Sequence, residues 1–121
     1  MKKLLVVMMI LVSATVASAE ERLNIQTGND LVFYFKAWDR GINNAATGDD
    51  NNNVRYLGGY MQGVIRTLGY ADKVSIPPDT PYNQMIDVVK KLLNDHPEWW
   101  DYSSVLIIDI ALARVWPPKQ P

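Results

Sequence analysis

The hexapeptide HPEWWD, residues 96 to 101, brings together residue types that carry out chemistry in proteins. It contains His96, the chain's only histidine, and beside it Glu98, Trp99, Trp100 and Asp101. A histidine with nearby carboxylates can bind a metal ion or transfer protons, and exposed tryptophans can anchor a protein partner. The hexapeptide is therefore a candidate metal site, catalytic site, partner-binding loop or plain helix boundary.

Residues that would complete a metal or catalytic site are missing. The chain has no cysteine and no second histidine, so His96 lacks the P-C-x-x-C partner ligands of a zinc deaminase. No serine lies in a nucleophile-elbow sequence that would complete a triad with His96. Asp49 and Asp50 are paired carboxylates, but aromatic residues to bind a sugar and the calcium-loop pattern are both absent around them. We therefore expect that the protein is not an enzyme and that it binds neither a metal ion nor a cofactor.

The same hexapeptide is typical of a boundary between two helices. Residue 95 or 96 can act as a cap, Pro97 suits a first helical position, and Glu98 places favourable charge in a first turn. Trp99 and Trp100 are adjacent, so both cannot face inward on a regular element, and one is expected at the surface as an anchor. A boundary alone and a boundary that also binds a partner remain alternatives.

Residues 1–19 have the features of a cleavable signal peptide. Two lysines precede nine consecutive apolar residues, Leu4 to Val12, and the segment ends with the A-x-A pattern Ala17-Ser18-Ala19. A membrane-spanning helix needs roughly 18 or more apolar residues, so this apolar run is too short for an anchor. We expect cleavage after Ala19 and export of residues 20–121 to the periplasm.

The remaining 102 residues form one domain with a single core. Ten basic and thirteen acidic residues give this mature chain a net charge of −3, and no basic cluster favours nucleic acid or an anionic membrane. Without cysteine, stability must come from apolar packing, with oligomerisation as a possible aid.

Apolar spacing predicts an all-α bundle of about four helices. Their expected ranges are 29–40, 54–68, a third from Pro81 capped by Thr80, and a fourth ending before Pro117. The asparagine-rich segment 41–53 is expected to be a surface loop, and residues 75–81 a rigid connection. Short strands within 104–110 remain an alternative because that apolar segment also suits a strand.

Glycines within the second predicted helix require a compensating interaction. Gly58, Gly59 and Gly63 each cost about 1 kcal/mol relative to alanine in a helix interior. Gly59 and Gly63 share a face, so we expect close approach of another helix, from the same chain or from a second copy. A phosphate-binding loop is disfavoured because the G-x-G-x-x-G order is absent.

The order of motifs resembles that of the Rap/Tai immunity proteins of type VI secretion systems. The resemblance lies in GYMQGV at 59–64, in IPPDTPYNQMIDVVKKLLNDHPE at 76–98 and in ALARVWP at 111–117. The matching family positions are Gly59, Tyr60, Gly63, Pro77, Gln84, His96, Pro97, Trp116 and Pro117. Family members usually have cysteines at the positions of Phe35, Leu57, Ser75 and Pro118, so this chain resembles a cysteine-free variant.

The resemblance implies a small periplasmic helical protein, often dimeric, that occludes the active site of a peptidoglycan amidase toxin. It also implies that the loop at His96 to Asp101 enters the toxin's cleft. The residues expected to contact the partner are Glu98, Trp99, Trp100 and Asp101, with Asp49 and Asp50 as a second acidic loop. Gly59, Tyr60 and Gly63 are expected in helix packing or in a dimer. A small periplasmic stress chaperone is the alternative function.

Overall fold

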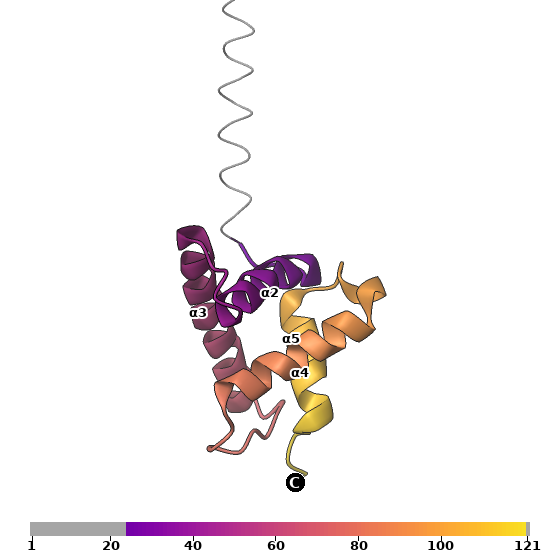
Figure 1. Ribbon diagram of the computed structural model, residues 1–121. Helices are drawn as coiled ribbons and strands as arrows, with labels where there is room; N and C mark the ends of the chain where they lie inside the picture. The colour runs from indigo at the N-terminus through magenta and orange to yellow at the C-terminus, as the bar shows by residue number, and fades with distance from the viewer. Residues whose placement is uncertain (1–23, 121) are drawn as a thin grey trace, which may run out of the picture.

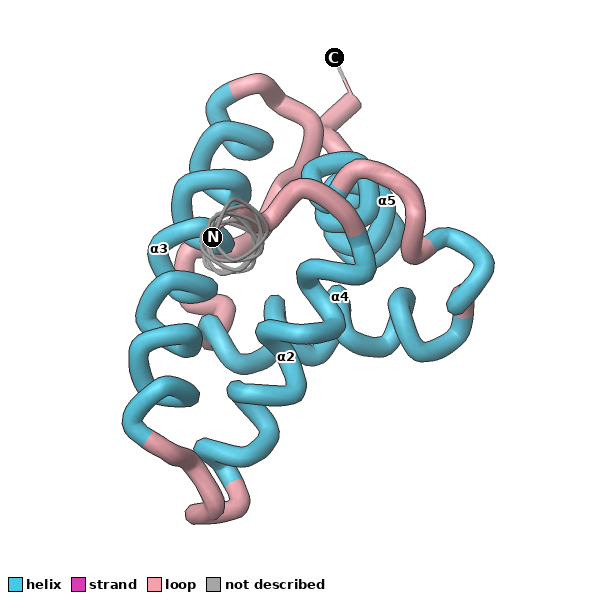
Figure 2. The backbone as a smooth tube through the Cα atoms, turned by 90° about the horizontal axis from the view of Figure 1, so that it is seen from above, coloured by secondary structure: helices cyan, strands magenta, loops and turns pink. Residues whose placement is uncertain are grey.

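The computed structural model describes residues 24–120, and the predicted signal peptide lies outside them. Its helices are α2 (Gly28–Ile42), α3 (Gly48–Tyr70), α4 (Tyr82–Asp95), a short 3₁₀ helix (Pro97–Trp99) and α5 (Ser104–Val115). Figures 1 and 2 show α3 along one edge of the molecule, with the other helices packed beside it. The all-α prediction with four main helices is confirmed. No helix among the described residues is long and apolar enough to cross a membrane.

The core is made of apolar side chains from all four α-helices. Burial of one large aliphatic side chain stabilises the folded state by about 1.5–3 kcal/mol. Burial of these side chains therefore accounts for much of the driving force for folding. The fully buried aliphatic side chains are Leu31, Leu57, Met61, Ile86, Val89, Ile107, Ile108 and Leu112.

The prediction of a surface loop over residues 41–53 is wrong for its second half, because α3 begins at Gly48. Thr47 caps this helix: its Oγ1 accepts a hydrogen bond from the Asp50 amide at 3.2 Å. The Asp50 carboxylate accepts one in return from the Thr47 amide at 3.1 Å. This reciprocal capping box starts the helix despite three successive asparagines, and acidic residues in the first turn also favour the positive helix end.

Helices α2 and α4 begin within two residues of their predicted starts. Thr27, not Asn29–Asp30, caps α2, and Asp30 completes a capping box by accepting a hydrogen bond from the Thr27 amide at 3.0 Å. Pro81 is the N-cap of α4, one residue after the predicted Thr80. Segment 104–110 is helical, so the strand alternative is wrong.

The chain after α5 turns back toward the connection between α3 and α4. The Ser75 amide donates to the Trp116 carbonyl at 3.1 Å, and the Lys119 amide donates to Ser75 Oγ at 3.0 Å. Pro117 directly follows the C-cap residue of α5 and cannot continue the helix, as predicted. Within the connection, Pro77 accepts a turn hydrogen bond from the Thr80 amide at 3.1 Å.

Candidate functional site

The hexapeptide at 96–101 forms most of the loop that joins α4 to α5, as Figure 1 shows in orange. His96 is the C-cap of α4, and its amide donates to the Leu92 carbonyl at 3.0 Å. Pro97 then opens the 3₁₀ helix at its first position, with Glu98 in the same turn. The boundary reading of the hexapeptide is therefore confirmed. We refer to residues 96–103 as the late loop.

The late loop is held against the start of α2. The Asn29 amide donates to the Trp100 carbonyl at 2.8 Å, and the Gly28 amide donates to the Tyr102 carbonyl at 3.0 Å. Amides of a first helical turn have no partner within their own helix, so these carbonyls satisfy them. An antiparallel bridge between Thr27 and Ser103 continues the contact. The loop is thus fixed along its backbone by an element far away in the sequence.

Gly28 makes this close approach possible. A Cβ atom at this position would lie 2.9 Å from the Trp100 Cα and 3.0 Å from its carbonyl oxygen. It would also lie 2.6 Å from the Ile107 Cδ1. Gly28 was not predicted from the sequence, because the loop that approaches it is distant in the chain.

The two tryptophans of the loop have different environments. The Trp100 Nε1–H donates to the Leu93 carbonyl at 2.7 Å, so its polar edge is bound within the fold. Trp99 instead lies in an aromatic stack, 3.9 Å from the His96 ring and nearly parallel to it. Tyr102 stacks on Trp99 at 6.2 Å, and the Arg114 guanidinium lies 5.4 Å from the Trp99 ring. Both rings are half-buried and pack against the core, so neither tryptophan is a fully exposed anchor. Trp100 therefore has a structural role, and Trp99 belongs to the stacked group.

The charges of the late loop are mostly acidic. His96 Nδ1 lies 2.9 Å from Glu98 Oε1, and the hydrogen bond from His96 lowers the pKa of Glu98. Asp101 is exposed, and its Oδ1 accepts a hydrogen bond from Asn29 Nδ2 at 3.1 Å. Among residues 24–120, no group of three or more histidine, cysteine or acidic side chains is placed to hold a metal ion. The loop offers an aromatic and acidic surface and no assembled reaction centre.

Asp49 and Asp50, expected to act together, separate in the structure. Asp50 is buried and accepts two hydrogen bonds from Arg40, at 2.8 Å from Nε and 2.6 Å from the terminal nitrogen. These bonds, with that from the Thr47 amide, hold the pKa of Asp50 well below its usual range. Asp50 thus fixes α2 to α3 and is not available to a partner, whereas Asp49 stays exposed.

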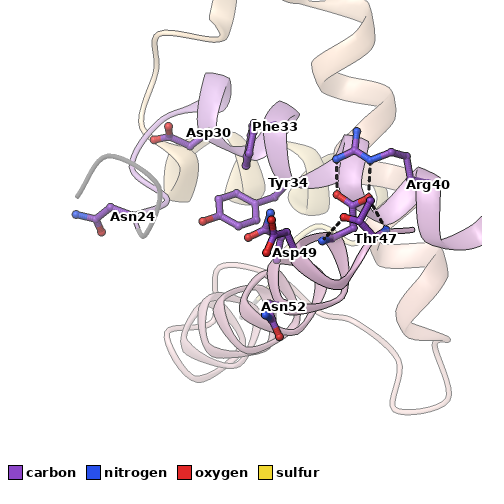
Figure 3. Close-up of a pocket in the computed structure, with 10 residues that line it drawn as sticks. Asn24, Asp30, Phe33, Tyr34, Arg40, Thr47, Asp49 and Asn52 are labelled. Carbon is purple, nitrogen blue, oxygen red and sulfur yellow. Dashed lines mark hydrogen bonds and ion pairs between the residues drawn. The ribbon is translucent and has the colours of Figure 1, made fainter. Parts of the chain in front are cut away.

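Asp49 lines a cleft of about 740 Å³ between α2 and the start of α3. Figure 3 shows Arg40 at one end and Asn24 at the other, with Tyr34 between them. The half-exposed ring of Phe33 stands on the same side of α2. The late loop does not contribute to this cleft, so the two predicted acidic surfaces are separate features.

The face with Gly59 and Gly63 is open. A Cβ atom at either glycine would meet nothing within 4 Å, so the expectation of close helix packing within the chain is wrong for both. Contact with a second copy stays a prediction. Tyr60, predicted with them, does reach another helix, because its hydroxyl is hydrogen-bonded to Ser104 Oγ of α5.

The remaining motif positions lie at ends of elements or on the surface. Gln84 is exposed in the first turn of α4. Trp116 is the C-cap residue of α5 and packs partly buried against the core. Among the described residues, no hydrogen bond or ring contact joins these positions to the aromatic stack of the late loop.

Comparison with protein families identifies the chain. The model of the Rap1a immunity proteins matches residues 27–118, from the N-cap of α2 to just beyond α5. The chain belongs to the Rap1a immunity protein family. Immunity proteins act by binding a cognate toxin, so membership favours a binding role over an enzymatic one. Searches of curated proteins and of solved structures gave no match.

The four positions at which the resemblance predicts cysteines in other family members lie in two different environments. Phe35 of α2 and Leu57 of α3 are both buried in the core. Ser75 lies against the segment that contains Pro118, where it accepts the hydrogen bond from the Lys119 amide. Phe35 and Leu57 thus contribute apolar packing, whereas Ser75 contributes a hydrogen bond.

Proposed function

We propose that this Rap1a family member is a periplasmic immunity protein. It binds a peptidoglycan amidase delivered by type VI secretion and occludes the amidase's active-site cleft. The observation that carries the proposal is the late loop, whose backbone is fixed by α2 and which presents the Trp99 stack beside Glu98 and Asp101. A loop ordered before binding loses little conformational entropy when it enters a cleft.

Charge supports the same proposal. The exported chain carries a net charge of −3, and the late loop adds exposed carboxylates where the partner would approach. An acidic binding surface accelerates encounter with a basic partner and disfavours partners of the same sign. A basic amidase is therefore the preferred target. Family membership favours this reading over a stress chaperone that binds many unfolded clients.

The periplasmic location rests on the sequence of residues 1–19. The test is co-expression in a bacterial periplasm with a candidate type VI amidase, with lysis followed by turbidity. The full chain should prevent lysis, and a matched chain without residues 2–19 should not, because it would stay in the cytoplasm. Lysis despite good periplasmic levels of the full chain, for every candidate amidase, would refute the proposal.

The glycine face is the proposed contact with a second copy. Gly59 and Gly63 are exposed on α3, so a second backbone has room to approach. Light scattering on purified protein should give the mass of a dimer, and Gly63→Leu should return it to a monomer. A wild-type protein that remains monomeric at high concentration would remove dimerisation from the proposal.

A further inference from the structure

Three exposed apolar residues occur within five positions of the sequence at the junction of the late loop and α5. Tyr102 is 46% exposed, and Val105 and Leu106 in the first turn of α5 are 45% and 47% exposed. We call these three residues the apolar patch. The opposite face of the same helix is buried in the core through Ile107 and Ile108. Helix α5 is therefore apolar on its outer side as well as on its inner side at this end.

The apolar patch continues into the aromatic stack of the late loop. The Tyr102 ring stacks on Trp99, which in turn stacks on His96. Among the described residues, Ile42, Tyr70 and Val115 are exposed apolar side chains at the last positions of α2, α3 and α5. Phe33 and Tyr56 are also exposed, and both rings contact Tyr34 beside the cleft between α2 and α3. Singly exposed apolar residues are ordinary, whereas a contiguous group marks a binding surface.

The backbone beneath the apolar patch is held rigidly. The Tyr102 carbonyl accepts the hydrogen bond from the Gly28 amide, and the Ser104 amide donates to the Gln26 carbonyl at 2.8 Å. The Ser104 hydroxyl is bonded to Tyr60 of α3. The patch thus sits on a loop end and a helix start that are tied to two other elements. Rigid aromatic and aliphatic groups lose little entropy on binding.

The charged residues of the late loop and α5 are mostly acidic. Glu98 and Asp101 of the late loop are exposed, and Asp109 is partly exposed one turn beyond Val105 on α5. The nearby cation, Arg114, lies over the Trp99 ring. An interface typically has an apolar centre and a polar rim, so the complementary surface is apolar with basic residues around it.

We infer that the apolar patch is the energetic centre of the toxin-binding surface. Its occupant is an apolar area of the toxin bordered by lysine or arginine residues. The inference rests on the proposed immunity function and moves the main contact from the hexapeptide to Tyr102, Val105 and Leu106. Trp100 takes no part in it, because its indole is bonded within the fold.

The test measures binding of purified variants to the amidase identified by the co-expression assay, in a catalytically inactive form. Tyr102→Ala and Leu106→Gln should each weaken binding at least about tenfold, since central apolar contacts dominate affinity. The matched controls are Tyr70→Ala and Ile42→Gln, at positions that are 88% and 64% exposed. The controls should bind within about twofold of wild type, the ordinary effect of residues outside a hot spot.

Circular dichroism and thermal melts check that each variant folds. Truncation of Tyr102 leaves the backbone carbonyl that Gly28 uses, and Leu106→Gln keeps a good helix former at an exposed position. Folded Tyr102→Ala and Leu106→Gln proteins that both bind as tightly as wild type would overturn the inference. A wild-type protein that binds no candidate amidase would overturn the proposed function instead.

A second measurement tests the basic border of the occupant. Asp109→Asn removes one rim charge, and the association rate should fall at low salt while the dissociation rate changes little. The difference from wild type should shrink as salt screens the charges. An association rate that is independent of both salt and this substitution would refute the charged part of the inference.

Discussion

Gly28→Ala tests whether the late loop is packed as closely against α2 as the structure indicates. The new methyl group would lie 2.9 Å from the Trp100 Cα, and that backbone is held by the 2.8 Å bond from the Asn29 amide. The Ile107 Cδ1, at 2.6 Å, can move aside because it is the end of a flexible side chain. The backbone contact cannot relax in this way. Overpacking of this kind costs about 1–3 kcal/mol, so we expect a destabilisation of that size.

Gly59→Ala is the matched control because it makes the same change where there is room. A Cβ at Gly59 meets nothing within 4 Å, and the residue lies inside α3. Replacing an interior helical glycine by alanine gains about 0.5–1 kcal/mol. The two substitutions should therefore differ by about 1.5–4 kcal/mol, with opposite signs relative to wild type.

The assay is urea unfolding followed by far-ultraviolet circular dichroism, with thermal melts as a second measure. For a domain of this size, 1 kcal/mol corresponds to about 4–8 °C in Tm. Low protein concentration keeps the comparison to the monomer. A stabilisation of Gly59→Ala that disappears at high concentration would indicate close contact with a second copy. Gly28→Ala with wild-type stability would refute the packing described between α2 and the late loop.

Three further predictions concern buried polar groups. Tyr82→Phe should leave stability unchanged or raise it by up to about 1 kcal/mol in thermal melts, because the buried Tyr82 hydroxyl has no hydrogen-bond partner. Its control, Tyr60→Phe, loses the hydrogen bond to Ser104 and should lower stability by about 1 kcal/mol. Trp100→Phe should lower stability by about 1 kcal/mol in urea unfolding yet keep toxin affinity, and a loss of affinity without a loss of stability would contradict its structural role. Arg40→Met should destabilise the protein most at neutral pH. The ion pair lowers the pKa of Asp50, so it stabilises the fold above the ordinary aspartate pKa of about 4, and this stabilisation is lost as the pH falls further. The stability difference between Arg40→Met and wild type, measured by acid titration, should therefore shrink below about pH 4.

The helical fold could be predicted because its apolar residues recur at helical spacing. Leu57, Met61 and Leu68 of α3 recur at helical spacing within the predicted range 54–68 and are all buried. Their period of three to four residues is a property of the local sequence, and it determines which face turns inward. Helix starts were less accurate, since composition alone hid the Thr47 capping box within an asparagine-rich segment.

The candidate site was only partly predictable. The hexapeptide identified the late loop. The roles of its two tryptophans depend on the Leu93 carbonyl, which binds Trp100, and on the Arg114 side chain, which lies over Trp99, and tertiary packing brings both groups into place. The separation of Asp49 from Asp50 likewise depends on Arg40, ten residues earlier on another helix. Contacts between distant segments leave no periodic signal in a single sequence.

The hydrogen bonds between the start of α2 and the late loop also have a consequence for when the molecule becomes competent to bind. Asn29 and Asp101 are 72 residues apart, so the loop cannot take its shape until nearly the whole domain has been synthesised and folded. Local opening of the loop must break the hydrogen bonds that join it to the start of α2. We therefore expect the loop to be among the last segments to exchange amide hydrogens. The Gly28, Asn29 and Ser104 amides should therefore exchange at rates close to that of global unfolding. If the proposed function holds, an unfolded chain would present no binding surface, and neutralisation of the toxin would begin only after folding is complete.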